Sequence, residues 1–366
     1  MNRSPRILIV RTDRMGDVIL STPVIRNLRR AFPDGYLAMM VRPENRELVE
    51  GNPDLNAVIL YDKDRAEQGI SGNLRFARRL RQHRFDTALI LHSTNRVILA
   101  TWLAGIRWRV GFARRLGWML TDRLPYIKKE GERHEMEYNL DLLPLLGIHP
   151  STSSGSENSG QGWERTLFIP VQPEQEAKVS AFLQSNGVNR SATCVVLHPG
   201  ASCPSKRWPA ERFAALGERL VRQHGARVVV VTGPAEKERG RAVIERMRSP
   251  AISALGTFSL GELACLFRQA RCLISNDSGP VHLACAVGTP VISIFGRWGA
   301  GLSPKRWGPT GPNSFYLHKD IGCRPCLAHR CTIGFACLTA VTVEEVLVAA
   351  ENAAGLKREV ALEVSV

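Results

Sequence analysis

The segment RILIVRTDRMGDVILSTPVIRNLRRAF, residues 6–32, decides the fold of the N-terminal half of this chain. It begins with RILIV, a continuous apolar run typical of a strand buried on both faces. The polar loop RTDRMGD (residues 11–17) follows, and DVILSTPVIRNLRRAF (residues 17–32) then has apolar residues at helical spacing. A buried strand, a short loop and an amphipathic helix begin a βαβ unit, so the segment predicts a parallel sheet covered by helices.

The same alternation continues along the whole chain. In the first half we predict strands at residues 36–41, 56–61 and 86–91 and helices at residues 73–85 and 135–147. In the second half we predict strands at residues 194–200, 227–233, 272–277 and 291–295 and helices at residues 209–225, 236–247, 260–270, 279–288 and 342–355. The predicted fold class is therefore α/β, with two doubly wound parallel-sheet domains facing an interdomain cleft.

The length of 366 residues supports two domains, since a single core rarely grows beyond about 250 to 300 residues. We expect an N-terminal domain at residues 1–150 and a C-terminal domain at residues 166–345. A flexible linker rich in Ser and Gly is expected at residues 151–165, and a final helix and tail at residues 346–366.

The formal net charge of +15 provides an excess of basic residues for an anionic partner. The excess is eight in residues 1–150 and seven in the rest, so no basic tail explains it. The densest clusters are Arg75, Arg78, Arg79, Arg81 and Arg84, and Arg107, Arg109, Arg114 and Arg115. The first cluster is interpreted either as a solvated helix face or as a surface for a polyanion.

No apolar run reaches the roughly 18 residues needed to span a bilayer, and ILIV is too short for a signal-peptide core. A cytoplasmic protein is therefore expected. Nine cysteines without a secretory signal argue against a disulfide scaffold. Five of them lie among apolar neighbours and are predicted to be small core residues: Cys194, Cys203, Cys265, Cys272 and Cys285.

The other four cysteines gather in CRPCLAHRCTIGFAC, at Cys323, Cys326, Cys331 and Cys337. Four sulfurs at this spacing could hold zinc or an iron–sulfur cluster, although the spacing fits no standard zinc ribbon. Reduced thiols or a labile disulfide are the alternatives, and no metal is assigned to the site.

Ligands of open parallel sheets bind at the carboxyl ends of strands, so the loops that directly follow strands are the candidate sites. Four loops qualify: residues 11–17, 198–208, 232–236 and 276–282. GASCPSKR fails the phosphate-loop pattern at Ser205 and Arg207, and no strand is followed by G-x-G-x-x-G. An NTPase and a dinucleotide-dependent oxidoreductase are therefore disfavoured.

The loop NDSGPVHLA predicts a phosphate site at a helix N-terminus, with Pro280 in the first turn. The alternative is that Asp277 or Ser278 only caps the helix. Lys206 and Arg207 could balance two phosphates or lie in a solvated turn.

Three further acidic residues each have two interpretations. Glu236 suits ribose hydroxyls, or it is an ordinary surface residue. Asp62 and Asp64 resemble a metal-binding D-x-D motif, but we interpret them as a solvated strand end.

Three of these segments together resemble glycosyltransferase family 9, the lipopolysaccharide heptosyltransferases. They are ILIVRTDRMGDVILSTPVIRNLRRAFP, HPGASCPSKRWPAERF and LISNDSGPVHLACAVGTPVISIFG, in this order. The resemblance covers nearly the whole chain except PSTSSGSENSGQG. It implies a GT-B fold, an acceptor-binding first domain, a second domain that binds ADP-heptose, inversion at the anomeric carbon, and no cofactor or obligatory metal.

The resemblance also implies roles for individual residues. Asp17 corresponds to the general base, with helix capping as its alternative role, and Thr12, Asp13 and Arg14 are candidates for acceptor binding. Lys206 meets the diphosphate, and Arg207 and Glu236 are further candidates on the donor side. The motif NDSG..H places Asp277, Ser278, Gly279 and His282 around the phosphates and the sugar.

The implied activity is transfer of heptose to the anionic, lipid-anchored Kdo/heptose core of lipopolysaccharide, at the cytoplasmic face of the inner membrane. A peripheral membrane contact is expected and a nucleic acid partner is not. The alternatives are a family 9 transferase that uses another nucleotide sugar, and a non-catalytic nucleotide-sugar-binding protein.

Overall fold

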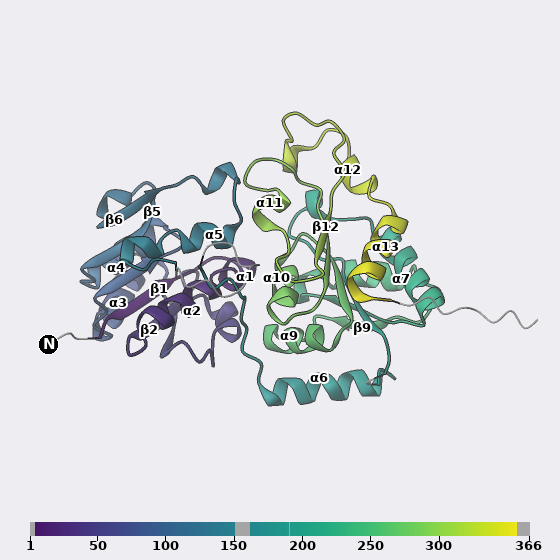
Figure 1. The fold of residues 1–366 in the computed structure, drawn as a ribbon, viewed down its shortest axis with the longest axis horizontal. Coiled ribbons are helices and arrows are strands. Elements are labelled where there is room, and N and C mark those ends of the chain that lie inside the picture. Colours follow the sequence, from purple (N-terminus) through teal and green to yellow (C-terminus); the bar gives the residue numbers. More distant parts are fainter. Residues whose placement is uncertain (1–3, 151–161, 190, 357–366) are drawn as a thin grey trace, which may run out of the picture. The chain divides into compact units, whose positions relative to one another are not determined.

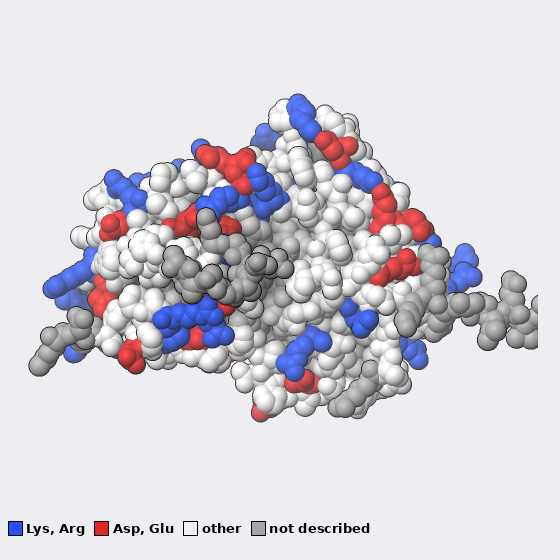
Figure 2. Space-filling view, in the orientation of Figure 1, with Lys and Arg blue, Asp and Glu red and all other residues white. Residues whose placement is uncertain are grey.

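The computed structural model describes residues 4–150, 162–189 and 191–356. Its contacts divide the chain into a first unit, Met1–Pro170, and a second unit, Val171–Val366 (Figure 1). The predicted linker falls for the most part on residues 151–161, which lie outside the described residues. Charged side chains of both signs lie at the surface of each unit (Figure 2).

The first unit is a six-stranded parallel sheet in the order β3-β2-β1-β4-β5-β6. Its strands are β1 (Arg6–Val10), β2 (Tyr36–Val41), β3 (Ala57–Leu60), β4 (Thr87–Ile90), β5 (Trp108–Ala113) and β6 (Asp122–Pro125). Its helices are α1 (Met15–Ile19), α2 (Thr22–Ala31), α3 (Gly69–Gln82), α4 (Asn95–Leu103) and α5 (Glu135–Leu140). Short 3₁₀ turns are η1 (Pro43–Leu48), η2 (Gly117–Met119), η3 (Lys128–Glu130) and η4 (Leu143–Leu146).

The second unit repeats this topology, with the order β12-β11-β10-β7-β8-β9. Its strands are β7 (Cys194–His198), β8 (Arg227–Thr232), β9 (Ile252–Leu255), β10 (Cys272–Asn276), β11 (Val291–Ile294) and β12 (Phe315–Leu317). Its helices are α6 (Pro173–Ser185), α7 (Ala210–His224), α8 (Lys237–Ile244), α9 (Leu260–Gln269), α10 (Gly279–Ala286), α11 (Pro304–Trp307), α12 (Ala336–Thr339) and α13 (Val343–Ala354). Its 3₁₀ turns are η5 (Pro204–Lys206), η6 (Pro234–Glu236) and η7 (Ala328–Arg330).

The predicted α/β class with two doubly wound parallel sheets is confirmed. Alternate strand residues supply each core, as in the first unit, where Leu8 and Val10 pack with Phe76 and Leu80 of α3 and Val97 of α4. The strand order reverses between β1 and β4 and, equivalently, between β7 and β10. A ligand crevice in such a sheet lies at the carboxyl ends of these two central strands.

Two helices predicted as continuous are divided in the structure. The helix predicted at residues 17–32 is divided into α1 and α2, because Pro23 has no N–H and its ring clashes with a continuing helix. The hydroxyls of Ser21 and Thr22 donate to the carbonyls of Asp17 and Ile19, both at 2.8 Å, and satisfy the end of α1. The helix predicted at residues 135–147 likewise ends at Leu140, and η4 follows with a proline in its first turn.

Four of the five cysteines predicted to lie in the core are buried. Cys203 is the exception, because it is only half-buried in the loop before η5, where its Sγ lies 3.4 Å from Oγ of Ser205.

Candidate active site at two strand ends

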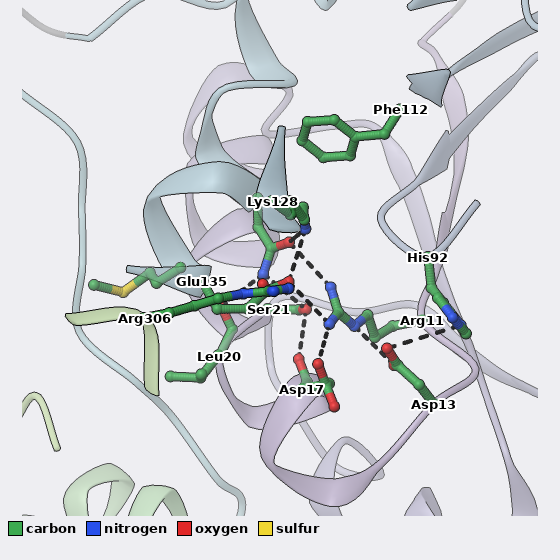
Figure 3. Close-up of polar contacts among 12 residues, drawn as sticks. Arg11, Asp13, Asp17, Leu20, Ser21, His92, Phe112, Lys128, Glu135 and Arg306 are labelled. Carbon is green, nitrogen blue, oxygen red and sulfur yellow. Dashed lines mark hydrogen bonds and ion pairs between the residues drawn. The ribbon is translucent and has the colours of Figure 1, made fainter. Parts of the chain in front are cut away.

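The loop after β1 is organised by a buried arginine. Arg11 directly follows the strand, and its side chain is 3% exposed. Its Nε donates to Oδ1 of Asp13 at 2.8 Å, and its Nη2 donates to Oδ1 of Asp17 and to Oε1 of Glu135 at 3.1 Å (Figure 3). One guanidinium therefore holds three carboxylates in fixed positions.

A second buried cation, Lys128, completes this group. Its Nζ donates to Oε1 of Glu135 at 2.7 Å and to Oδ1 of Asn139 at 2.8 Å, and it lies 4.6 Å from the ring centroid of Phe112 (Figure 3). We call Arg11, Asp13, Asp17, Lys128 and Glu135 the carboxylate cluster. It contains two cations and three carboxylates, so it has one formal negative charge beyond its internal pairing.

Asp17 combines a partly exposed carboxylate with a raised pKa. Its side chain is 16% exposed, and among the described residues only its Oδ1 accepts a hydrogen bond. Burial raises the pKa of Asp17 to about 6, against the lowering effect of Arg11. A carboxylate with this pKa is a better general base near neutral pH than the unperturbed aspartate assumed from the sequence.

The capping role considered for Asp17 is not what the structure shows. Helix α1 begins at Met15, so Asp17 is its third residue, and the N-cap is Arg14. No side chain caps this helix, and the Asp17 carboxylate pairs with Arg11 instead of with backbone N–H groups.

The other predicted acceptor residues occupy different environments. Thr12 is 2% exposed, Arg14 is exposed, and Asp13 lies between them with its backbone carbonyl accepting from Asn45 Nδ2 at 2.9 Å. Burial raises the pKa of Asp13, although Arg11 opposes the shift. Of the three, only Asp13 accepts a hydrogen bond from the Arg11 side chain, as Asp17 does.

His92 is a residue of this site that sequence reasoning missed. Its Nδ1 lies 3.8 Å from Oδ2 of Asp13, and burial together with Arg11 lowers its pKa to about 4 (Figure 3). The imidazole is therefore neutral at physiological pH. Its position could have been inferred, because it follows β4, the strand that pairs with β1 at the switch point.

The second unit carries a contrasting group at the end of β10. Oδ2 of Asp277 lies 3.0 Å from Nζ of Lys206 and 2.9 Å from Nη2 of Arg297. These three residues, which we call the cation cluster, are largely buried and have one formal positive charge beyond their pairing. Burial lowers the pKa of Lys206, Asp277 raises it, and Arg297 adds to the lowering.

Arg297 was not predicted as a site residue. It follows β11, which pairs with β10, so its place at the same sheet edge follows from the topology. Its Nε is buried and has no hydrogen-bond partner among the described residues. A buried donor without a partner is costly, and an anionic ligand would satisfy it.

The start of α10 lies directly beside the cation cluster. Ser278 occupies its N-cap position but its side chain makes no capping hydrogen bond, so the capping interpretation is wrong for this residue. The Ser278 hydroxyl instead lies 3.3 Å from Nδ1 of His198 and 3.0 Å from the Ser275 hydroxyl. Gly279 is the first helical residue, and His282 is buried in the same helix. The first N–H groups of α10 can therefore serve an anion.

Arg207 and Glu236, which lies on η6 after β8, both bond to the backbone of Ala201 in the loop after β7. Ala201 donates its N–H to Oε1 of Glu236 at 2.9 Å, and its carbonyl accepts from Nε of Arg207 at 3.0 Å. Gly200 permits this approach, because a Cβ there would lie 2.6 Å from Oε2 of Glu236. Burial lowers the pKa of Arg207, an effect to which Arg239 adds. These two predicted donor residues are thus joined through Ala201 and lie apart from the cation cluster's own ion pairs.

The four clustered cysteines are all free thiols. Sγ of Cys337 donates to the carbonyl of Gly296 at 2.9 Å, and Sγ of Cys331 accepts from the N–H of Phe335 at 3.1 Å. In the described ranges, the structure gathers no group of three or more His, Cys, Asp or Glu side chains that could hold a metal ion.

Two Rossmann-like units, each with a charged cluster at its switch point, have the architecture of the GT-B glycosyltransferases. The chain belongs to glycosyltransferase family 9 (heptosyltransferase), whose family model matches residues 73–336. It is therefore a glycosyltransferase, and the predicted resemblance is confirmed.

Individual relatives agree with this assignment. Lipopolysaccharide heptosyltransferase 2 of Escherichia coli K12 is 22% identical over 304 residues, which cover 82% of this chain and 85% of the relative. A solved glycosyl transferase of family 9 from Veillonella parvula is 26% identical, with a TM-score of 0.84 and coverage of 98% and 99%. The Escherichia coli heptosyltransferase WaaC, solved with ADP, is 19% identical, with a TM-score of 0.67 and coverage of 95% and 100%.

Proposed function

We propose that this glycosyltransferase moves heptose from ADP-heptose to the Kdo/heptose inner core of lipopolysaccharide, with inversion at the anomeric carbon. The observation that carries the proposal is the cation cluster at the uncapped start of α10, because it suits a nucleoside diphosphate. The solved WaaC complex contains ADP, which supports the choice of nucleotide.

On the donor side, the diphosphate lies against the first N–H groups of α10, with Lys206 and Arg297 neutralising its charge. Asp277 holds these two cations side by side. As the bond between the anomeric carbon and the diphosphate oxygen breaks, negative charge develops on ADP, and fixed cations in a buried site stabilise it. Glu236 accepts hydrogen bonds from the ribose hydroxyls through its carboxylate, close to the β7 loop.

On the acceptor side, Asp17 removes the proton from the attacking hydroxyl. The oxygen forms its bond to the anomeric carbon on the face opposite the departing ADP, which gives inversion. Arg11 keeps the carboxylate oriented, and its charge prevents a higher pKa that would leave Asp17 protonated. The acceptor is anionic and lipid-anchored, which places the reaction at the cytoplasmic face of the inner membrane.

The test is turnover by the purified full chain. Release of the nucleoside diphosphate is measured, as ADP with ADP-heptose and a Kdo-containing lipid acceptor, and in parallel as ADP, UDP or GDP with ADP-glucose, UDP-sugars and GDP-sugars. We expect acceptor-dependent ADP release only with ADP-heptose, and a product with the inverted anomeric configuration by NMR. Faster turnover of another nucleotide sugar would overturn the choice of donor, and retention of configuration would overturn the mechanism.

A further inference from the structure

Residues 69–121 hold most of the chain's excess positive charge. The segment contains ten arginines, no lysine and a single acidic residue, Asp86. Asp86 lies just before β4 and accepts from the backbone N–H of Arg6 at 2.9 Å, so neither α3 nor α4 contains an acidic side chain. Arg78 and Arg81 of α3 are exposed and make no ion pair with any described residue, whereas Arg79 pairs with Glu67 at 2.9 Å.

The same segment exposes large apolar side chains. Ile70 is 83% exposed, Trp118 is 70% exposed and Trp102 is 50% exposed, and Leu74 and Leu99 are also exposed. On α3, Ile70 and Leu74 are four residues apart, and on α4, Leu99 and Trp102 are three residues apart, so each pair shares one side of its helix. The opposite sides of the helices, with Phe76 and Val97, pack on the sheet.

These side chains lie on neighbouring elements of the first unit. Helix α3 packs against α4 (Figure 1). Helix α4 in turn contacts η2, which carries Trp118. We call this surface the arginine face, defined by the outer sides of α3 and α4 and by η2. Both helices begin after the carboxyl ends of strands, as does the loop of Asp17, so the N-terminal ends of these helices lie toward the same sheet edge as the carboxylate cluster.

We infer that the arginine face docks the enzyme on an anionic lipid bilayer. Guanidinium groups complement lipid phosphates, tryptophan prefers the interface between headgroups and hydrocarbon, and exposed Ile and Leu gain by entering the bilayer boundary. A nucleic acid would complement the arginines but would leave the exposed aliphatic side chains in water. The inference extends the proposed function, because a lipid-anchored acceptor is presented at a membrane surface.

The experiment is co-sedimentation of the full chain with vesicles of phosphatidylglycerol and phosphatidylcholine, and with vesicles of phosphatidylcholine alone. We expect binding to the anionic vesicles that weakens as salt is added. The charge-reversed pair Arg78→Glu and Arg81→Glu should weaken this binding about tenfold or more, since each basic residue near the surface contributes measurably. The apolar pair Leu99→Ser and Trp102→Ser should weaken it at high salt as well.

The matched control is Arg222→Glu with Arg246→Glu, which changes the net charge equally but lies on the second unit. This control should bind vesicles like the wild type. Binding of both arginine-face variants at wild-type strength would overturn the inference, and so would equal loss in the control. Preferential binding of an oligonucleotide, lost in the Arg78 and Arg81 variant while vesicle binding persists, would assign the face to nucleic acid instead.

A turnover assay with a water-soluble, delipidated acceptor separates this inference from the proposed function. The Arg78 and Arg81 variant should retain wild-type turnover of that acceptor. Absence of ADP-heptose turnover in the wild type, with vesicle binding intact, would refute the proposed function and leave the docking surface standing. Should the Leu99 and Trp102 variant fail to fold by circular dichroism, the charge-reversed pair still decides the outcome.

Discussion

The two switch points of this chain have the same backbone and opposite side-chain charge. In the first unit, one buried arginine is surrounded by three carboxylates, with Lys128 as the second cation. In the second unit, one buried carboxylate is surrounded by two cations. Both clusters lie at the carboxyl ends of the central strands of sheets with equivalent strand order.

The difference shows how one fold can serve two halves of a transfer reaction. A cluster with an extra negative charge and a carboxylate of raised pKa is suited to accept a proton. A cluster with an extra positive charge beside a helix N-terminus is suited to stabilise a leaving diphosphate. Arg11 pairs with all three carboxylates of the first cluster, and Asp277 pairs with both cations of the second. Arg11 and Asp277 are therefore positioning residues. The following predictions test whether the two clusters act separately in this way.

The largest expected effect follows from removing the base. Asp17→Asn preserves the size of the side chain but cannot accept a proton, so kcat should fall by roughly 10² to 10⁴. Calorimetry should show unchanged ADP affinity, because the proposed ADP contacts belong to the other cluster. The matched control is Asp13→Asn, which should lose less activity. A folded Asp17→Asn variant with near-normal turnover, beside an inactive Asp13→Asn variant, would transfer the role to Asp13.

Much of this arrangement could be predicted from the sequence. The sequence predicts the loops that follow β1, β7, β8 and β10, because strands and their carboxyl ends are visible in local patterns. The sequence predicts Lys206 and Asp277 as site residues, and the structure places them in direct contact. What local patterns do not contain is which loops become neighbours: His92 and Arg297 belong to the clusters only because β4 pairs with β1 and β11 pairs with β10.

The buried partners were harder still to infer. Glu135 and Lys128 lie more than 100 residues after Arg11 in the sequence. Nothing in their local sequence connects them with Arg11. The raised pKa of Asp17 depends on burial by the whole unit, so it could not be predicted from its loop alone. The break between α1 and α2, by contrast, could have been predicted from Pro23.

The next effect concerns the cation cluster. Lys206→Met and Arg297→Met should each weaken ADP binding about 10- to 100-fold, since a hydrogen bond to a charged group contributes about 1.5–3 kcal/mol. Adenosine affinity should change little, because adenosine has no diphosphate. In each variant Asp277 retains the other cation, so the fold should survive. Isothermal titration with both ligands checks this, with Arg222→Met on α7 as the control. Equal weakening of ADP and adenosine would contradict the assignment.

The next prediction concerns pH, where we expect a smaller change in kcat/KM that reports on the carboxylate cluster alone. Asp17 must be deprotonated to act, and burial raises its pKa to about 6, so kcat/KM should rise about tenfold per pH unit below pH 6 and level off above it. His92 and His198, whose pKa values burial lowers to about 4, do not titrate in that range. The control is the affinity for ADP-heptose without acceptor, whose diphosphate has no terminal phosphate that ionises near pH 6, and it should stay flat over pH 5–7. A kcat/KM profile without a rise through pH 6 would exclude Asp17 as the group that limits the rate.

The smallest effect is expected at the four clustered cysteines, which we predict take no part in the chemistry. Cys337 and Cys331 make hydrogen bonds to backbone groups that a serine hydroxyl can reproduce. Cys331→Ser and Cys337→Ser should therefore change stability by only about 0.5 kcal/mol and leave kcat close to that of the wild type. Initial rates are compared with those of Arg297→Met, which lies in the neighbouring loop after β11 and removes a proposed phosphate contact. Metal content is measured in the same preparations by elemental analysis. If both serine variants stayed folded by circular dichroism but lost a bound metal and turnover together, the prediction would be wrong. The donor site would then require the cysteines as well as its two cations.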